Sequence, residues 1–277
     1  MNNNNNEEIN HLYSCSRWAG YDPELVIQNF VKGEEAAYLY MKSTYPVAEN
    51  VPYGRGERQK VDVWGTVEDK LFIYFHGGYW QEGDRKHILS PAVHVTKHMA
   101  FASVGYCLAS PERQLSKTVR DVVEAVKFLI DRYPQVKEIT LGGHSAGAFL
   151  AFQAATRLRH HKIKKLAFMA GIFQLEELVS CEIGQTIGLT MEEAKQYSCD
   201  PHDLYGLGVK ILILADLKDA PKLIEQNRTL YSALKTVKMP TFHELISCDH
   251  FNMITQFQKQ DSEQSKVLFE FLGIEQN

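Results

Sequence analysis

The stretch Gly142-Gly143-His144-Ser145-Ala146-Gly147 is the most informative part of the sequence for the fold. It contains the pattern Gly-x-Ser-x-Gly, after the short β-branched run 138–141 and before the alanine-rich run 148–155. This order predicts a strand, a sharp turn and a helix, with the Ser145 hydroxyl pushed out of the sheet by a strained backbone. Glycines around such a turn remove Cβ atoms where the strand and the helix crowd together. Ser145 is therefore a candidate nucleophile, and the alternative is an ordinary glycine-rich turn.

Composition narrows the class of protein. The chain has 277 residues, of which 44% are hydrophobic and 23% charged, as in a globular α/β protein. Its net charge of −4 is not gathered in blocks, which argues against nucleic-acid and membrane-surface partners. It has no apolar run near the roughly 18 residues of a membrane span and no secretory signal pattern. Scattered cysteines favour reduced thiols, so we expect a cytoplasmic protein: Cys15, Cys107, Cys181, Cys199 and Cys248.

Strand-like and helix-like runs alternate along the chain, which predicts one mainly parallel sheet with helices on both faces. The asparagine-rich residues 1–10 are expected to form a disordered tail, and residues 11–277 a single α/β domain. Residues 171–208 mix short helical patches with glycines and prolines, and we interpret them as a lid-like insertion rather than a surface excursion. The expected strands are 59–64, 71–75, 101–106, 138–141, 164–170, 209–215 and 241–246, and the expected helices 23–41, 85–99, 115–133, 148–155, 221–236 and 262–272.

A serine nucleophile needs a histidine to accept its proton and an acid to orient that histidine. In this kind of sheet the acid and the histidine follow the serine, on loops after later strands. His250 follows the last predicted strand and is the preferred base among eleven histidines. Asp219, in the turn before a helix, is favoured as the acid over Asp216, which is flush with its strand. Asp249 is expected to hold the loop of its neighbour His250.

A second glycine motif, His76-Gly77-Gly78-Tyr79-Trp80, follows the predicted strand 71–75. Glycines let backbone N–H groups approach a carbonyl oxygen closely, so this motif and the residue after the serine are candidates for oxyanion stabilisation. The alternative is a simple turn after a buried strand. The expected donors are the N–H groups of Gly77, Gly78, Tyr79 and Ala146.

Neither a metal nor a cofactor is expected. The pair His160-His161 has no third ligand at a suitable spacing, which favours a solvated basic patch over a metal site. The glycines Gly142-Gly143 lack the lysine that a phosphate-binding loop needs. The expected partner is a small-molecule substrate. The sequence does not fix the oligomeric state, and a homodimer is compatible with it.

Taken together, these motifs resemble the kynurenine formamidase (arylformamidase) family, a branch of the α/β-hydrolases. The resemblance implies the α/β-hydrolase fold and hydrolysis of N-formyl-L-kynurenine to L-kynurenine and formate in tryptophan breakdown. The matching stretches run in order over nearly the whole chain: Ser16-Arg17-Trp18, Val51-Pro52-Tyr53-Gly54, His76 to Gln81, Arg132-Tyr133-Pro134, Gly143 to Ala148, Asp219-Ala220-Pro221, Glu244-Leu245 and Asp249-His250-Phe251.

The same resemblance implies a catalytic triad of Ser145, Asp219 and His250. In the family the acid precedes a small residue and a proline, as Asp219 does here. One departure is Asp216, because the family often has a glycine at that position.

A formyl group needs little space, whereas an aromatic leaving group needs an apolar wall. Tyr79, Trp80 and Phe251 are the candidates for this wall, with ordinary packing as the alternative. The polar partners of the amino-acid end are not identified from the sequence. Two other functions stay open at this point. One is a general carboxylesterase of small aryl esters with the same triad, and the other is a non-catalytic binding protein of the α/β-hydrolase fold.

Overall fold

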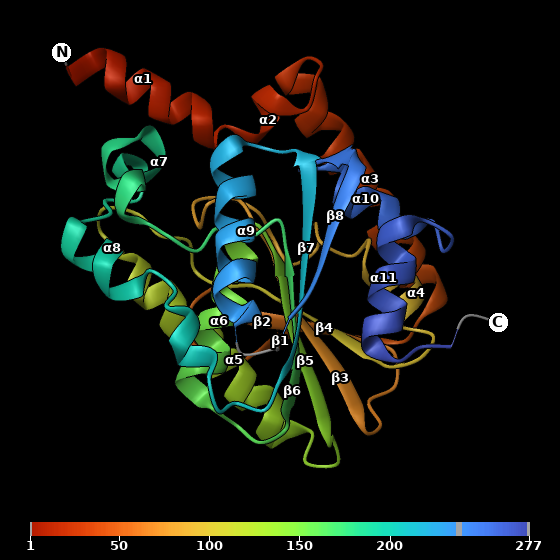
Figure 1. The fold of residues 1–277 in the computed structure, drawn as a ribbon. Coiled ribbons are helices and arrows are strands. Elements are labelled where there is room, and N and C mark those ends of the chain that lie inside the picture. Colours follow the sequence, from red (N-terminus) through yellow and green to blue (C-terminus); the bar gives the residue numbers. More distant parts are fainter. Residues whose placement is uncertain (1, 237–239, 276–277) are drawn as a thin grey trace.

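An eight-stranded sheet forms the centre of the molecule (Figure 1), and the computed structural model describes residues 2–236 and 240–275. The strand order is β1-β2-β4-β3-β5-β6-β7-β8. β2 pairs antiparallel with β1 and β4, and every other neighbouring pair is parallel. The strands are β1 (Val47–Pro52), β2 (Lys60–Trp64), β3 (Lys70–Phe75), β4 (Ala100–Val104), β5 (Glu138–His144), β6 (Ile163–Met169), β7 (Lys210–Lys218) and β8 (Pro240–Asp249).

Helices cover both faces of this sheet, as the alternation of elements predicts. The α-helices are α1 (Asn2–Tyr13), α2 (Cys15–Trp18), α3 (Pro23–Thr44), α4 (Ala92–Val95), α5 (Leu115–Arg132), α6 (Ala146–Leu158), α7 (Glu182–Thr186), α8 (Met191–Tyr197), α9 (Pro221–Lys235), α10 (Asn252–Thr255) and α11 (Glu263–Leu272). Three short 3₁₀ helices are η1 (Glu176–Ser180), η2 (Pro201–Leu204) and η3 (Gln256–Gln258). No helix within the described residues is both long and apolar enough to span a membrane.

The sheet divides the hydrophobic core into two layers. Along β3, Leu71, Ile73 and Phe75 enter the layer under α5, α6 and α9, whereas Phe72 and Tyr74 enter the layer under α3, α4 and α11. Successive side chains of a strand point to opposite faces, so a continuously apolar strand fills both layers at once. This is why the apolar run 71–75 occupies the centre of the sheet.

Two parts of the fold differ from the expectation. Only α4 is helical within the predicted helix 85–99, because Pro91 disfavours helical backbone at Ser90. The Ser90 N–H instead donates to the buried carboxyl group of Glu34 at 3.1 Å. At the N-terminus, α1 stands where a disordered tail was expected. It packs against α9 and η1, and Asn10 accepts the Glu182 N–H at 2.8 Å.

Candidate active site

Ser145 lies on the sharp turn between β5 and α6. Its backbone has φ 57° and ψ −122°, a left-handed conformation that is strained for a residue with a side chain. Its N–H donates to the Met169 carbonyl at 2.8 Å. A Cβ on Gly147 would lie 2.1 Å from the Phe75 carbonyl oxygen, and one on Gly143 would lie 2.3 Å from Gly147. The glycines of the motif are therefore steric requirements of this turn.

The ends of β7 and β8 bring an acid and a histidine together. The Nδ1 atom of His250 lies 2.7 Å from Oδ2 of Asp219, and both side chains are buried. The Ala220 N–H donates to the other Asp219 oxygen at 2.6 Å. An Nδ1–H held by this carboxylate leaves Nε2 free to accept a proton. Within the described residues Ser145 makes no side-chain hydrogen bond to His250, and such contacts often tighten only when substrate binds.

Asp216 has a different environment from Asp219. It is only 1% exposed, and neither carboxyl oxygen has a hydrogen-bond partner among the described residues. Burial, and next the charges of Asp219 and Asp249, raise the pKa of Asp216 well above its usual range. The raised pKa favours the protonated form of Asp216, and it is Asp219 that contacts His250.

Asp249 closes the loop that carries His250. Its Oδ1 accepts the N–H groups of Phe251 at 2.9 Å and of Asn252 at 2.8 Å. The Asn252 side-chain amide in turn donates to Oδ2 of Asp249 at 2.7 Å, and its oxygen accepts the Asp249 N–H at 2.9 Å. This local network fixes the start of α10, and it fits the expectation that Asp249 holds the loop.

A second histidine packs against His250. The ring centroids of His144 and His250 are 4.3 Å apart, and the Nε2 atom of His144 has no partner among the described residues. Burial, and next the proximity of His250, lower the pKa of His144 well below its usual range. His144 is thus a neutral neighbour that adds no positive charge beside an imidazolium form of His250.

The glycine motif after β3 forms a tight loop against Ser145. Gly78, Tyr79 and Trp80 have φ angles of 97°, 47° and 62°. A Cβ on Gly77 would lie 3.1 Å from the Ser145 Cβ, so the two backbones approach closely. The N–H groups of Gly78, Tyr79 and Ala146 donate to no acceptor in the described part of the chain. Unpaired N–H groups beside a serine are the arrangement that stabilises a developing oxyanion.

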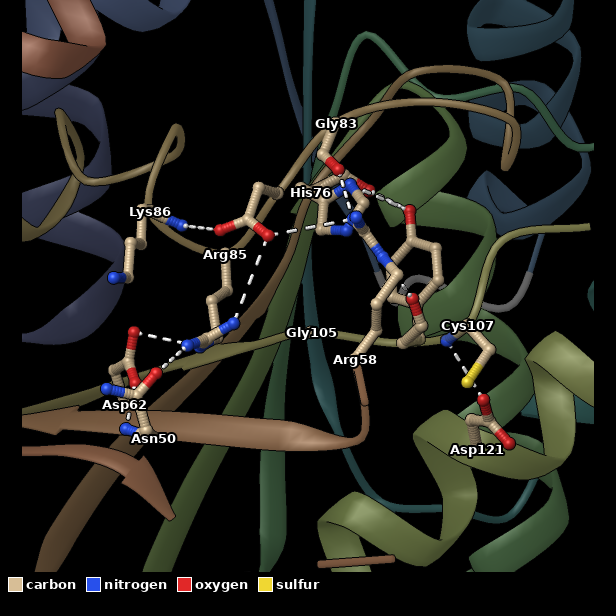
Figure 2. A network of polar contacts seen from close by, with 12 residues as sticks. Asn50, Arg58, Asp62, His76, Gly83, Arg85, Lys86, Gly105, Cys107 and Asp121 are labelled. Carbon is tan, nitrogen blue, oxygen red and sulfur yellow. Dashed lines mark hydrogen bonds and ion pairs between the residues drawn. The ribbon is translucent and has the colours of Figure 1, made fainter. Parts of the chain in front are cut away.

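A network of polar contacts around Arg58 holds this loop in place (Figure 2). The Arg58 guanidinium donates to the Gly83 carbonyl and, at 3.2 Å, to the Tyr106 carbonyl. The Tyr106 hydroxyl donates to the His76 carbonyl at 2.8 Å, and the two rings stack at 4.0 Å. Burial lowers the pKa of His76 to about 4, so its ring is neutral near pH 7. Arg58 also lies 3.7 Å from Asp84. The network thus holds the loop at its first residue, His76, and at its other end, Gly83 and Asp84.

Trp80 does not line the site, so its assignment to the substrate wall is wrong. The side chain is fully buried, and its indole N–H donates to the Ala146 carbonyl at 3.2 Å. Its ring packs edge-on against Phe149 at 4.9 Å. The positive φ of Trp80 turns the side chain into the core, where it connects the glycine loop to α6.

A cavity of about 670 Å³ opens over Ser145 and His250. Tyr79 and Phe251, the two remaining candidates for the substrate wall, line it, and Phe30 of α3 packs edge-on against Phe251 at 5.6 Å. These three side chains make an aromatic wall. The sequence marked Phe30 only as part of the apolar face of a helix, because nothing local shows which neighbour that face meets.

The N-terminal segment, residues 7–17, contributes seven of the residues that line this cavity and covers part of it. The Tyr79 hydroxyl donates to the Tyr13 carbonyl at 2.7 Å, and the Tyr13 hydroxyl donates to Glu177 at 2.9 Å. Arg17 also lines the cavity, and its guanidinium has no carboxylate partner among the described residues. Sequence reasoning did not assign this segment to the site, and its only signal was the family-like stretch Ser16-Arg17-Trp18.

The insertion 171–208 contributes less to the cavity than a lid would. Within the described residues only Glu182 and Ile183, both in α7, line the cavity. The 3₁₀ helix η2 packs against α6 and α9, and α8 packs against α5. Most of the insertion therefore covers the outer helices beside the site.

Comparisons with known proteins agree with this architecture. Residues 72–199 match the family model described as the alpha/beta hydrolase fold. The kynurenine formamidase of Danio rerio is 28% identical over 96% of this chain and 96% of its own, and that of Salmo salar is 27% identical over 97% of each. The kynurenine formamidase of Drosophila melanogaster is 28% identical over 79% of this chain and 80% of its own.

Solved structures share the fold. A protein from Silicibacter matches 94% of this chain and 98% of its own, with a TM-score of 0.79 and 20% identity. An esterase from Pyrobaculum calidifontis matches 90% of this chain and 93% of its own, with a TM-score of 0.68 and 18% identity. This chain has the α/β-hydrolase fold, and its sequence is similar to those of kynurenine formamidases over most of its length.

Proposed function

We propose that this protein is an arylformamidase that hydrolyses N-formyl-L-kynurenine to L-kynurenine and formate, in tryptophan breakdown. One observation carries the proposal. The serine on its strained turn and the buried His250–Asp219 pair meet in one cavity with an aromatic wall. Similarity to three proteins named kynurenine formamidase, near full length for two of them, supports the same activity. A general esterase would share the serine and histidine, but it would not need a site for an amino acid.

In the proposed mechanism, the Ser145 hydroxyl attacks the formyl carbon while Nε2 of His250 accepts the proton. Asp219 stabilises the imidazolium through the 2.7 Å contact with Nδ1. The negative oxygen of the intermediate accepts hydrogen bonds from the N–H groups of the glycine loop (Gly77 to Tyr79) and of Ala146. The C–N bond then breaks, and His250 gives its proton to the aniline nitrogen. Water, deprotonated by His250, attacks the formyl-serine ester and releases formate.

The two ends of the site suit the two ends of this substrate. Gly77 approaches Ser145 closely, and a formyl group, which carries only hydrogen on its acyl side, needs little space there. On the other side, Phe30, Tyr79 and Phe251 offer apolar surface to the aniline ring. We assign the α-carboxylate of the substrate to Arg17, because a guanidinium without a carboxylate partner is suited to bidentate binding.

We further propose that the enzyme works in the cytosol. All five cysteines are free, and four of them are buried. Unpaired cysteines are typical of proteins kept in a reducing compartment. Localisation of the tagged full-length chain in its own cells would test this.

The activity is tested by comparing two substrates with the purified chain. We expect a much higher kcat/KM for N-formyl-L-kynurenine than for p-nitrophenyl acetate. Ester hydrolysis without formamidase activity would contradict the proposal and favour a carboxylesterase. Absence of both activities in a folded protein would favour a binding protein. Formation of a stable adduct between Ser145 and a phosphonate inhibitor, located by peptide mass spectrometry, tests the nucleophile independently of the substrate.

A further inference from the structure

The N-terminal segment brings a thiol beside the base and the acid of the site. One potential ligand atom from each of Cys15, Asp219 and His250 lies within 4.8 Å of the other two. All three side chains are at least 95% buried, and the Cys15 sulfur also lies 3.8 Å from the Tyr79 hydroxyl. A thiolate, a carboxylate and an imidazole are all established ligands of Zn²⁺, and three protein ligands leave a fourth position for water. The proposed hydrolytic mechanism has no role for this thiol.

We propose that Cys15, Asp219 and His250 form an inhibitory Zn²⁺ site at the bottom of the cavity. The metal would enter from the cavity, which Cys15 and His250 both line. Zn²⁺ bound by Nδ1 of His250 and a carboxylate oxygen of Asp219 replaces the hydrogen bond between them. The imidazole proton then resides on Nε2, the nitrogen that must be free to accept the proton of Ser145. The inhibition rests on the proposed function, whereas metal binding does not.

The carboxylate of Asp219 favours a dication at this position. Burial, and next the charge of Asp219, raise the pKa of Cys15 well above its usual range. Without metal the thiol is therefore protonated and unreactive. Zn²⁺ must displace that proton into solvent, and the same Asp219 carboxylate that opposes the thiolate attracts the metal.

The test uses the full chain after removal of metal with a chelator. Zn²⁺ affinity is measured by competition with a chromophoric chelator, and Co²⁺ is added separately to record its thiolate charge-transfer absorption. We expect one Zn²⁺ per chain and inhibition that a chelator reverses. Cys15→Ser should weaken Zn²⁺ binding at least about 100-fold and abolish the Co²⁺–thiolate band, since even supporting residues of metal sites contribute about 10–100-fold.

Cys107→Ser is the matched control, because Cys107 is a free cysteine outside the cavity lining. It should keep both the Zn²⁺ affinity and the Co²⁺ band. Thermal unfolding of each variant establishes that it is folded. Equal Zn²⁺ affinity in the parent and Cys15→Ser, or no binding by the parent at millimolar Zn²⁺, would overturn the site. Zn²⁺ binding through Cys15 in a chain that lacks formamidase activity would leave the site intact and refute the proposed function instead.

Discussion

The carboxyl edge of the sheet and the N-terminal cover contribute to the same cavity in different ways. Ser145, Asp219 and His250 follow strand ends, and each is at most 3% exposed. The cover comes from residues before the first strand, and it presents the exposed Arg17 and the half-buried Phe30. The reactive groups thus follow strand ends, whereas Arg17 and Phe30, two of the groups assigned to the substrate, lie on helices outside the sheet.

This difference predicts a separation of effects. Changes at the sheet edge should reduce the rate of chemistry for every substrate. Changes in the cover should alter KM, and only for substrates that carry the group being recognised. The predictions below test this separation.

Ser145→Ala should have the largest effect. Loss of the nucleophile should lower kcat by about 10⁶-fold, because the acyl-enzyme can no longer form. Binding of the product L-kynurenine, measured by calorimetry, should stay within about twofold of the parent because the cover is intact. An unchanged rate would refute Ser145 as the nucleophile, whereas lost product binding would show that the two regions are not separable.

Asp219→Asn should lower kcat by about 10⁴-fold, since the amide favours the wrong tautomer of the histidine. The 2.7 Å contact of Asp219 with Nδ1 of His250 is the basis for this expectation. The loss should be equal for N-formyl-L-kynurenine and for unsubstituted formanilide. A larger loss for one of them would mean that Asp219 also binds the substrate.

Arg17→Met should raise KM for N-formyl-L-kynurenine by about 10- to 100-fold, the usual range for losing a hydrogen bond to a charged group. Formanilide, which lacks the amino-acid end, should be hydrolysed as by the parent. Arg17→Lys is the matched control, because it keeps the charge and loses bidentate geometry. Its KM for N-formyl-L-kynurenine should lie between those of the parent and Arg17→Met. An equal increase in KM for both substrates would show that Arg17 does not recognise the amino-acid end.

Asp216→Asn should have the smallest kinetic effect, within a fewfold of the parent. The amide is isosteric with the protonated carboxyl group that the raised pKa implies. A buried acid with a raised pKa is protonated when folded and charged when unfolded, so the parent loses stability as pH rises above about 4. The substituted amide does not titrate. The variant should therefore gain stability relative to the parent as pH rises from about 4 to about 7, measured by urea unfolding.

The sheet edge could be predicted from the sequence because its signals are local. The Gly-x-Ser-x-Gly turn, the apolar strand 71–75 and the loops after later strands each follow from short runs of residues. The preference for Asp219 over Asp216 also follows from position in a turn. The structure adds the reason, since Asp219 contacts His250 and Asp216 is buried without a hydrogen-bond partner among the described residues.

The cover could not be predicted in the same way. The asparagines of α1 are poor helix formers, and this helix depends on contacts with α9 and η1, which are far away in sequence. The apolar periodicity of 85–99 predicts a helix, but Pro91 and the contact between Ser90 and Glu34 prevent one. The buried position of Trp80 depends on a positive φ that its sequence does not reveal. In each case the deciding contact is tertiary.

The glycine loop also bears on how the enzyme loses activity on heating. Three consecutive residues, Gly78 to Trp80, hold positive φ angles, and two of them are not glycine. Backbone of this kind costs about 1–3 kcal/mol for each strained residue and persists only while its surroundings enforce it. The Arg58–Tyr106–His76 network is one of those surroundings. The strain is thus held by packing and hydrogen bonds of the core that Trp80 enters, so activity should disappear only when that core opens.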